Sequence, residues 1–153
     1  ESMATVYFED PVEGQEFVGD EVMVDKDEML EYARKNDPWP FHVDEEAAKA
    51  SPFGGLIASG GYAISLYYRL GHLLYNRADS RWAFLGGFDW HVSFPRPIRP
   101  GGRLRRKTVV RSKRLSSTPG RGVIDSVGTL INQNGEVVLR IEVASLIATR
   151  PSA

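Results

Sequence analysis

The fold of this chain is most constrained by an apolar run that follows the Gly60-Gly61 pair. The run, YAISLYYRLGHLLY, is apolar on nearly every face of a helix, with Arg69 and His72 as exceptions. A helix that is hydrophobic all round is usually buried. We therefore expect this helix at the centre of the core. His72 is expected to be a wall residue or a buried, hydrogen-bonded side chain rather than a ligand.

The chain after Asp79 has the composition of β-structure. Four strands are expected, separated by turn-forming segments: 82–94, 103–115, 123–133 and 137–149. Asn134-Gly135, a pair favoured in type I′ turns, would join the last two as a hairpin. Helices followed by a run of antiparallel strands predict an α+β fold in which the sheet wraps on the long helix.

Shorter elements are predicted before that helix. Phe17–Val24 is typical of a short strand. Asp25 and Glu28 have the spacing of a capping box, so a helix is expected to begin there. It should end at Asn36, because a proline two residues later cannot continue it. Asp44, followed by two glutamates and two alanines, marks a second, short helix.

Two titratable side chains of complementary chemistry, Asp37 and His42, lie five residues apart between these helices. Pro38 and Pro40 separate them and stiffen the loop. In polyproline geometry five residues span roughly 15 Å, so the loop must turn before both groups can share one substrate. The loop is therefore either an active site or a connector with a capping aspartate and a hydrogen-bonded histidine.

Glycines accompany this loop. Gly54-Gly55 precedes Gly60-Gly61, and the second pair opens the long apolar helix. A glycine at a helix start leaves backbone N–H groups open to an incoming oxygen, and the helix dipole favours negative charge there.

Length and composition exclude several classes of protein. With 153 residues, 42% hydrophobic and 25% charged, the chain is expected to be one globular domain over residues 3–150. Glu1 and Ser2, before Met3, are expected to be a cloning remnant. No apolar run of membrane-spanning length or signal peptide is visible, so a cytoplasmic location is expected. Without cysteines, and with three histidines that lack metal-ligand spacing, no metal site is expected.

Charge is distributed unevenly along the chain. Residues 1–50 carry 15 acidic and 4 basic side chains, whereas residues 51–153 carry 5 acidic and 15 basic ones. The halves should attract within the fold or across a subunit interface, unless both are independent solvated faces. Segment 103–114 holds seven Lys or Arg but no stacking aromatics, which argues against nucleic acid. It is either a solvated edge or a contact for a phosphate-bearing ligand.

Residues 36–65 resemble the MaoC-like dehydratases, a family that includes the (R)-specific enoyl-CoA hydratases. The family's motif runs Asp-x-Asn-Pro-x-His, then an acidic helix and a glycine-rich entry to the central helix. Asp37, Pro40 and His42 match that spacing. Three further segments are similar to the family outside the motif: EDPVEGQEF (9–17), FPRPIRPGGRL (94–104) and NQNGEVV (132–138).

The resemblance implies a single hotdog domain, usually dimerised, and a thioester substrate on coenzyme A or acyl carrier protein. Asp37 and His42 would hold the water that is added across an α,β double bond, or removed in reverse, and Gly60 N–H would bind the thioester oxyanion. No cofactor beyond the carrier of the substrate is implied. Six further residues are expected to contact the substrate: Trp39, Ser59, Gly61, Tyr68, Arg103 and Arg105.

Three positions depart from the family pattern. Trp39 stands at the motif's asparagine, Ser59 at a frequent histidine, and Gly102 where the turn usually has aspartate. Trp39 puts acyl-chain selectivity in question. A thioesterase of the same fold and a non-catalytic acyl-CoA-binding protein remain alternatives to a hydratase. Chain length, carrier and physiological direction do not follow from these residues.

Overall fold

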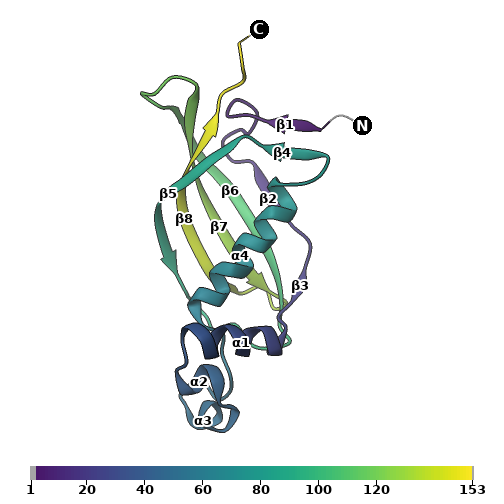
Figure 1. Cartoon of the computed structure of the whole chain (residues 1–153), viewed down its shortest axis with the longest axis vertical. Coiled ribbons are helices and arrows are strands. Elements are labelled where there is room, and N and C mark those ends of the chain that lie inside the picture. The colour runs from purple at the N-terminus through teal and green to yellow at the C-terminus, as the bar shows by residue number, and fades with distance from the viewer. Residues whose placement is uncertain (1–2, 153) are drawn as a thin grey trace.

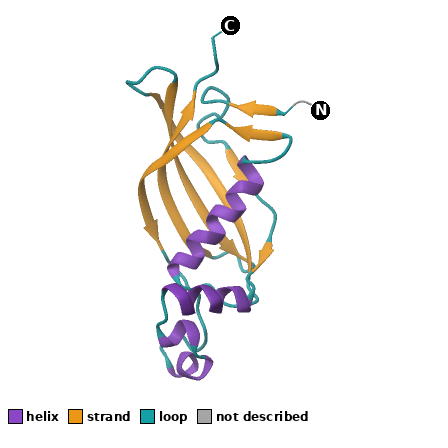
Figure 2. Ribbon diagram, in the orientation of Figure 1, coloured by secondary structure: helices purple, strands orange, loops and turns teal. Residues whose placement is uncertain are grey.

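A long helix, α4 (Gly60–Tyr75), crosses the inner face of a curved antiparallel sheet (Figures 1 and 2). The computed structural model describes residues 3–152, so Glu1 and Ser2 lie outside the described part. Six residues of α4 are buried: Tyr62, Ala63, Leu66, Tyr67, Leu70 and Gly71. All of these except Gly71 share one core with buried sheet residues such as Leu104, Leu130 and Ile141. The expected α+β hotdog architecture is confirmed.

The main sheet has the order β2-β6-β7-β8-β5, and β3 also pairs with β6. Its strands are β2 (Glu16–Val18), β3 (Val22–Met23), β5 (Phe84–Ser93), β6 (Arg103–Leu115), β7 (Arg121–Asn132) and β8 (Val137–Ala148). The four strands expected after Asp79 are all present, within two residues of their predicted bounds. A separate parallel pair joins β1 (Ala4–Val6) to β4 (Ser80–Trp82), and the sequence patterns did not predict it.

Two local predictions about strands are wrong in detail. The strand expected over Phe17–Val24 is interrupted, because the chain leaves the ladder with β6 between β2 and β3. In the β7–β8 hairpin Gly135 has φ of 76°, but Asp89 is the one non-glycine residue within 3–152 with positive φ. Asn134 therefore lacks the positive φ that a type I′ turn needs at both central positions. Gly135 N–H instead bonds Asn132 O at 3.0 Å, closing a longer loop.

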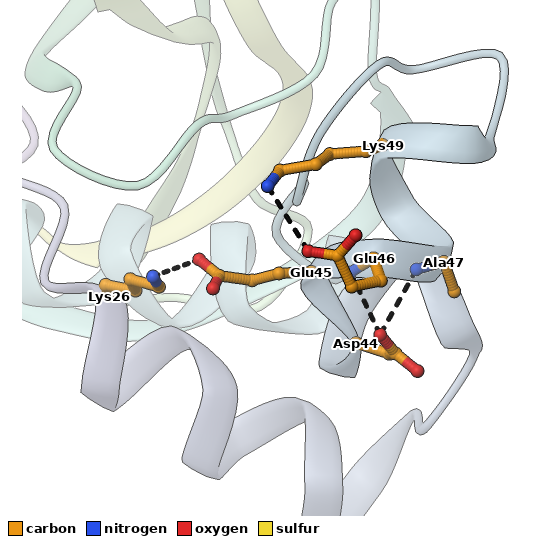
Figure 3. Close-up of polar contacts among 6 residues, drawn as sticks. All are labelled: Lys26, Asp44, Glu45, Glu46, Ala47 and Lys49. Carbon is orange, nitrogen blue, oxygen red and sulfur yellow. Dashed lines mark hydrogen bonds and ion pairs between the residues drawn. The ribbon is translucent and has the colours of Figure 1, made fainter.

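Three short helices gather at the end of the molecule where α4 begins (Figure 1). α1 (Lys26–Asn36) starts as predicted, with Asp25 accepting a 2.9 Å hydrogen bond from Glu28 N–H. α2 (Pro40–Val43) was not predicted. Figure 3 shows α3 (Glu45–Ala50), whose cap Asp44 accepts hydrogen bonds from two backbone N–H groups, and the ion pair of Lys26 with Glu45 that ties α1 to α3.

One side of α4 faces solvent in the single chain. The helix is therefore not buried on nearly every face, as its sequence suggested. Tyr68 and Leu73 are both more than half exposed. His72 is exposed as well, and its Nδ1 lies 3.1 Å from Asn76 Nδ2. Of the two settings expected for His72, the buried one does not hold and the wall residue does, because His72 lines a cavity described below.

Candidate functional site

Asp37 and His42 come together because the chain turns sharply between α1 and α2. Asp37 ends α1, its N–H bonding Ala33 O at 2.8 Å, and Trp39 N–H bonds Asp37 O at 2.9 Å. Pro40 then starts α2, a position that suits its fixed φ and missing N–H. The turn leaves His42 Nε2 3.5 Å from Asp37 Oδ2. The loop thus makes the turn that both groups need in order to share one substrate, which the spacing alone did not establish.

The hydrogen bond on the other side of the His42 ring fixes its tautomer. Nδ1 lies 2.8 Å from the carbonyl oxygen of Ile57. A carbonyl only accepts, so Nδ1 carries a proton, and in the neutral ring Nε2 is left with a free lone pair. The ring is only 7% exposed, which holds that lone pair in place toward Asp37. This geometry prepares Nε2 to accept a proton beside a carboxylate.

Ser59 supports the carboxylate from the start of α4. Its Oγ donates a 2.8 Å hydrogen bond to Asp37 Oδ2, and the side chain is almost fully buried. Ser59 is the N-cap residue of α4 but makes no side-chain capping bond, because its hydroxyl is turned to Asp37. We expected Ser59 to contact substrate. The structure gives it a hydrogen bond that positions Asp37, while no sequence signal pointed to the Ile57 carbonyl.

Gly60, the first residue of α4, lies next to Ser59. Within residues 3–152 its N–H donates to no acceptor, as is usual for the first turn of a helix. The Phe94 ring covers its Cα, and a Cβ built there would approach Cζ to 2.9 Å. Gly61 serves packing between helices, because a Cβ on it would collide with the Tyr32 hydroxyl of α1. Ser59 therefore connects the two parts of the site: it precedes Gly60, the backbone donor, and its hydroxyl binds Asp37.

Of the other predicted substrate contacts, Trp39 lies in the same loop as the pair, whereas Tyr68, Arg103 and Arg105 lie on other elements. The Trp39 indole is 62% exposed. Tyr68 packs on Trp90 at 5.4 Å and lines a cavity along the C-terminal half of α4, whose walls include neither Asp37 nor His42. Arg103 and Arg105 are exposed, on the face of β6 opposite the buried Leu104 and Arg106. Their contact with a substrate stays a prediction.

From Met3 to Ser152 no cluster of three or more His, Cys, Asp or Glu side chains could hold a metal ion. None of the helices in that range has both the length and the apolar character needed to cross a bilayer.

The chain is similar in sequence and fold to several known proteins. The family model of the MaoC like domain matches residues 8–128. A MaoC-like dehydratase from Rhodospirillum rubrum superposes with a TM-score of 0.87 at 33% identity, covering 96% of this chain and 99% of that one. The uncharacterized protein YdeM of Bacillus subtilis is 30% identical over 138 residues, 88% of this chain and 93% of its own length.

A third relative shares a shorter stretch. The 3-hydroxyacyl-thioester dehydratase Z of Mycobacterium tuberculosis is 41% identical over 64 residues, which are 42% of either protein. The family model alone spans well over half of the chain, and the first structural relative covers nearly all of it. The chain therefore belongs to the family of MaoC-like dehydratase domains.

Proposed function

We propose that the protein is a hydratase or dehydratase that acts reversibly on an enoyl or 3-hydroxyacyl thioester. The carrier of the acyl group would be coenzyme A or acyl carrier protein. The observation that carries this proposal is the orientation of His42, whose Nδ1 proton is bound by Ile57 O while Nε2 faces Asp37 Oδ2 at 3.5 Å. The dehydratase Z relative, similar over 42% of this chain, is named for the same class of reaction.

The proposed hydration uses one base and one bound water. The pair would hold the water between His42 Nε2 and Asp37. Nε2 takes one proton from it, the hydroxyl oxygen bonds to Cβ of the enoyl group, and the electron pair of the double bond moves toward the thioester. The imidazolium then returns a proton to Cα, which closes the balance. Histidine suits a transfer that must run in both directions near neutral pH.

The negative charge that develops on the thioester oxygen needs a donor. Gly60 N–H, without an acceptor in the described chain and at the positive end of the α4 dipole, is proposed for that role. A β-carbon at this position would meet the Phe94 ring. We propose that glycine is needed here so that the narrow path by which the thioester oxygen reaches the N–H stays open.

Incubation with crotonyl-CoA tests the proposal against its alternatives. Loss of the enoyl absorbance without release of free thiol is expected for a hydratase. Release of free thiol would instead identify a thioesterase, and saturable binding with neither reaction would identify a non-catalytic binder. A panel of enoyl-CoA chain lengths then defines the preferred acyl group, to which Trp39 and Tyr68 are proposed to contribute.

A further inference from the structure

A cavity of about 390 Å³ lies between the C-terminal half of α4 and the inner face of the sheet. Its walls are mainly aromatic and aliphatic, with Tyr67, Tyr75, Trp82 and Trp90 among them. Its volume falls in the range of small-molecule sites, which combine apolar walls with a few polar groups. The polar groups of this cavity determine what it can bind.

Arg106 brings a positive charge to this cavity. The residue is only 9% exposed, and its guanidinium stacks 3.6 Å above the Tyr67 ring. Nη1 donates to the main-chain oxygen of Tyr67 at 2.8 Å, and Nε donates to Thr108 Oγ1 at 3.3 Å. Among residues 3–152 no carboxylate lies within ion-pair distance of it. A buried charge is normally matched by an opposite one, so this guanidinium has unused capacity for an anion.

Two buried hydroxyl groups in the same walls also lack partners. Tyr67 Oη and Tyr75 Oη make no hydrogen bond to any described residue. Buried hydroxyls are usually satisfied, and each orphan implies a missing acceptor or donor. Desolvation raises the pKa of both tyrosines above the ordinary value and outweighs the opposing effect of the Arg106 charge, so both keep their protons at neutral pH. Both hydroxyl oxygens are themselves buried, so Arg106 is the group that determines which charge the cavity favours.

We propose that this cavity is a binding site for an organic carboxylate, with the carboxylate on Arg106 and the apolar body against the aromatic walls. Planar guanidinium and carboxylate groups pair through two parallel hydrogen bonds, which a neutral ligand of the same shape cannot reproduce. The site is separate from the Asp37–His42 pair, because its walls include neither residue, and only the case of a substrate's distal carboxylate rests on the proposed function.

The carboxylate has two conceivable sources. It is either the distal end of the acyl group of a substrate or a free carboxylic acid. Gly60 and Gly71 are separated along α4 by roughly 16 Å, at 1.5 Å per residue, a length that one extended acyl chain can span. The chemistry at Arg106 is the same in both cases.

Calorimetric titration of the full chain with octanoate, and in parallel with octan-1-ol, tests the site. Octanoate should bind about 10- to 100-fold more tightly than the alcohol, the range that charged hydrogen bonds supply. Arg106→Gln keeps a donor for Tyr67 O but removes the charge, and should abolish that preference. Arg111→Gln, an exposed arginine of the same strand that pairs with Glu142, is the matched control and should retain it. Equal binding of the two ligands, or of neither, would overturn the proposal.

Two further measurements keep the test decisive if Arg106→Gln does not fold. Ser126→Leu fills the cavity while leaving Arg106 in place, and should remove octanoate binding; retained binding would place the ligand elsewhere and refute the site. Competition by a coenzyme A thioester of a long-chain dicarboxylic acid, whose free carboxylate can reach Arg106, separates the sources of the carboxylate. Displacement of octanoate is expected if the cavity receives the distal end of a substrate, and simultaneous binding is expected if it holds a free acid.

Discussion

The hydrogen bond between His42 and Ile57 O decides which nitrogen can act as a base. With Nδ1 bound to a carbonyl, only Nε2 is free, and it faces Asp37 Oδ2. The five-residue spacing placed both side chains on one short, stiff loop but left open whether that loop turns, and it was the resemblance to the MaoC-like dehydratases that implied the pair. The partner Ile57 could not be predicted, since any residue type supplies a carbonyl and the contact joins positions 15 residues apart.

Asp37→Asn should lower kcat about 10²- to 10⁴-fold, the usual contribution of a group in general acid–base catalysis. Asparagine keeps the shape and can still accept from Ser59, but it removes the charge beside Nε2. KM should change little, because the carboxylate does not hold the distant part of the thioester. Steady-state hydration of crotonyl-CoA measures both constants, and an unchanged kcat would refute the role of Asp37.

His42→Ala should lower kcat by the same order, and the double mutant should be scarcely worse than the poorer single mutant, because both groups act on one water. Unlike Asp37→Asn, this change also removes a buried ring and leaves Ile57 O without its donor. We therefore expect a loss of about 1–3 kcal/mol in the free energy of unfolding. Urea denaturation separates that loss from the loss of activity. Activity losses that simply track unfolding would contradict the assignment.

Ser59→Ala tests the support of the carboxylate. The change removes the 2.8 Å hydrogen bond to Asp37 Oδ2, so kcat should fall by about tenfold with KM nearly unchanged. Ser59→Thr keeps the hydroxyl and should therefore retain most of the rate. If Ser59 only shaped the start of α4, the rate would not depend on whether the substitute carries a hydroxyl. A rise in KM with normal kcat would instead make Ser59 a substrate contact, as we expected from the sequence.

At the scale of elements, caps and hydrophobic runs predicted the helices well, whereas long-range pairing was out of reach. Asp25 and Asp44 begin α1 and α3 because their side chains bond nearby N–H groups, which is a local signal. The parallel pairing of β1 with β4 brings together segments more than 70 residues apart, which no local pattern reports. Side chains on α4 likewise seemed buried from composition alone, although Tyr68 and Leu73 face solvent.

The contact between α1 and α4 should depend on Gly61. A methyl group on Gly61 would collide with the Tyr32 hydroxyl, and overpacking of this kind costs about 1–3 kcal/mol. Gly61→Ala should therefore lower the free energy of unfolding, measured in urea. Adding Tyr32→Phe removes the colliding oxygen and leaves ring carbons at 3.0 and 3.2 Å, so the double mutant should regain part of the loss. Strictly additive effects would show that the two residues do not interact.

Strand β6 presents its basic residues in three different settings. Arg106 faces the core, and Arg103 and Lys107 pair with Glu21 and Glu16. Arg105 is exposed, without an ion pair inside the described range, and is the side chain most available to the phosphates of coenzyme A. Arg105→Glu should raise KM for a CoA substrate far more than for the matching pantetheine substrate. An equal effect on both would assign Arg105 to structure.

At the scale of the whole molecule, the opposed charges of the two parts of the sequence meet within one chain. Ion pairs connect acids of the first 50 residues with later arginines and lysines: Glu28–Arg69, Glu21–Arg103, Glu16–Lys107 and Asp10–Arg150. These pairs join the α1 region and the N-terminal strands to α4, the sheet and the C-terminal segment. Part of the opposed charge is thus paired inside the fold.

The exposed edge strand β5 argues for a second subunit. Strand β5 forms the edge of the main sheet beyond β8, and it exposes Phe84, Leu85 and Phe88. Tyr68 and Leu73 expose further apolar area on α4. An unpaired edge with apolar side chains is a template for pairing with another chain. We propose that two copies of the protein join at β5 into a continuous sheet.

Light scattering at micromolar concentration should therefore give the mass of a dimer. Leu85→Lys places a charge on the β5 edge and should shift the equilibrium toward monomer. Val18→Lys is the matched control, because Val18 is similarly exposed but lies on β2 at the opposite edge of the sheet. It should leave the dimer intact, since a surface charge away from the interface adds no repulsion between subunits. A monomer in the unmodified protein would refute the dimer, and dissociation by Val18→Lys alone would move the interface to the β2 edge.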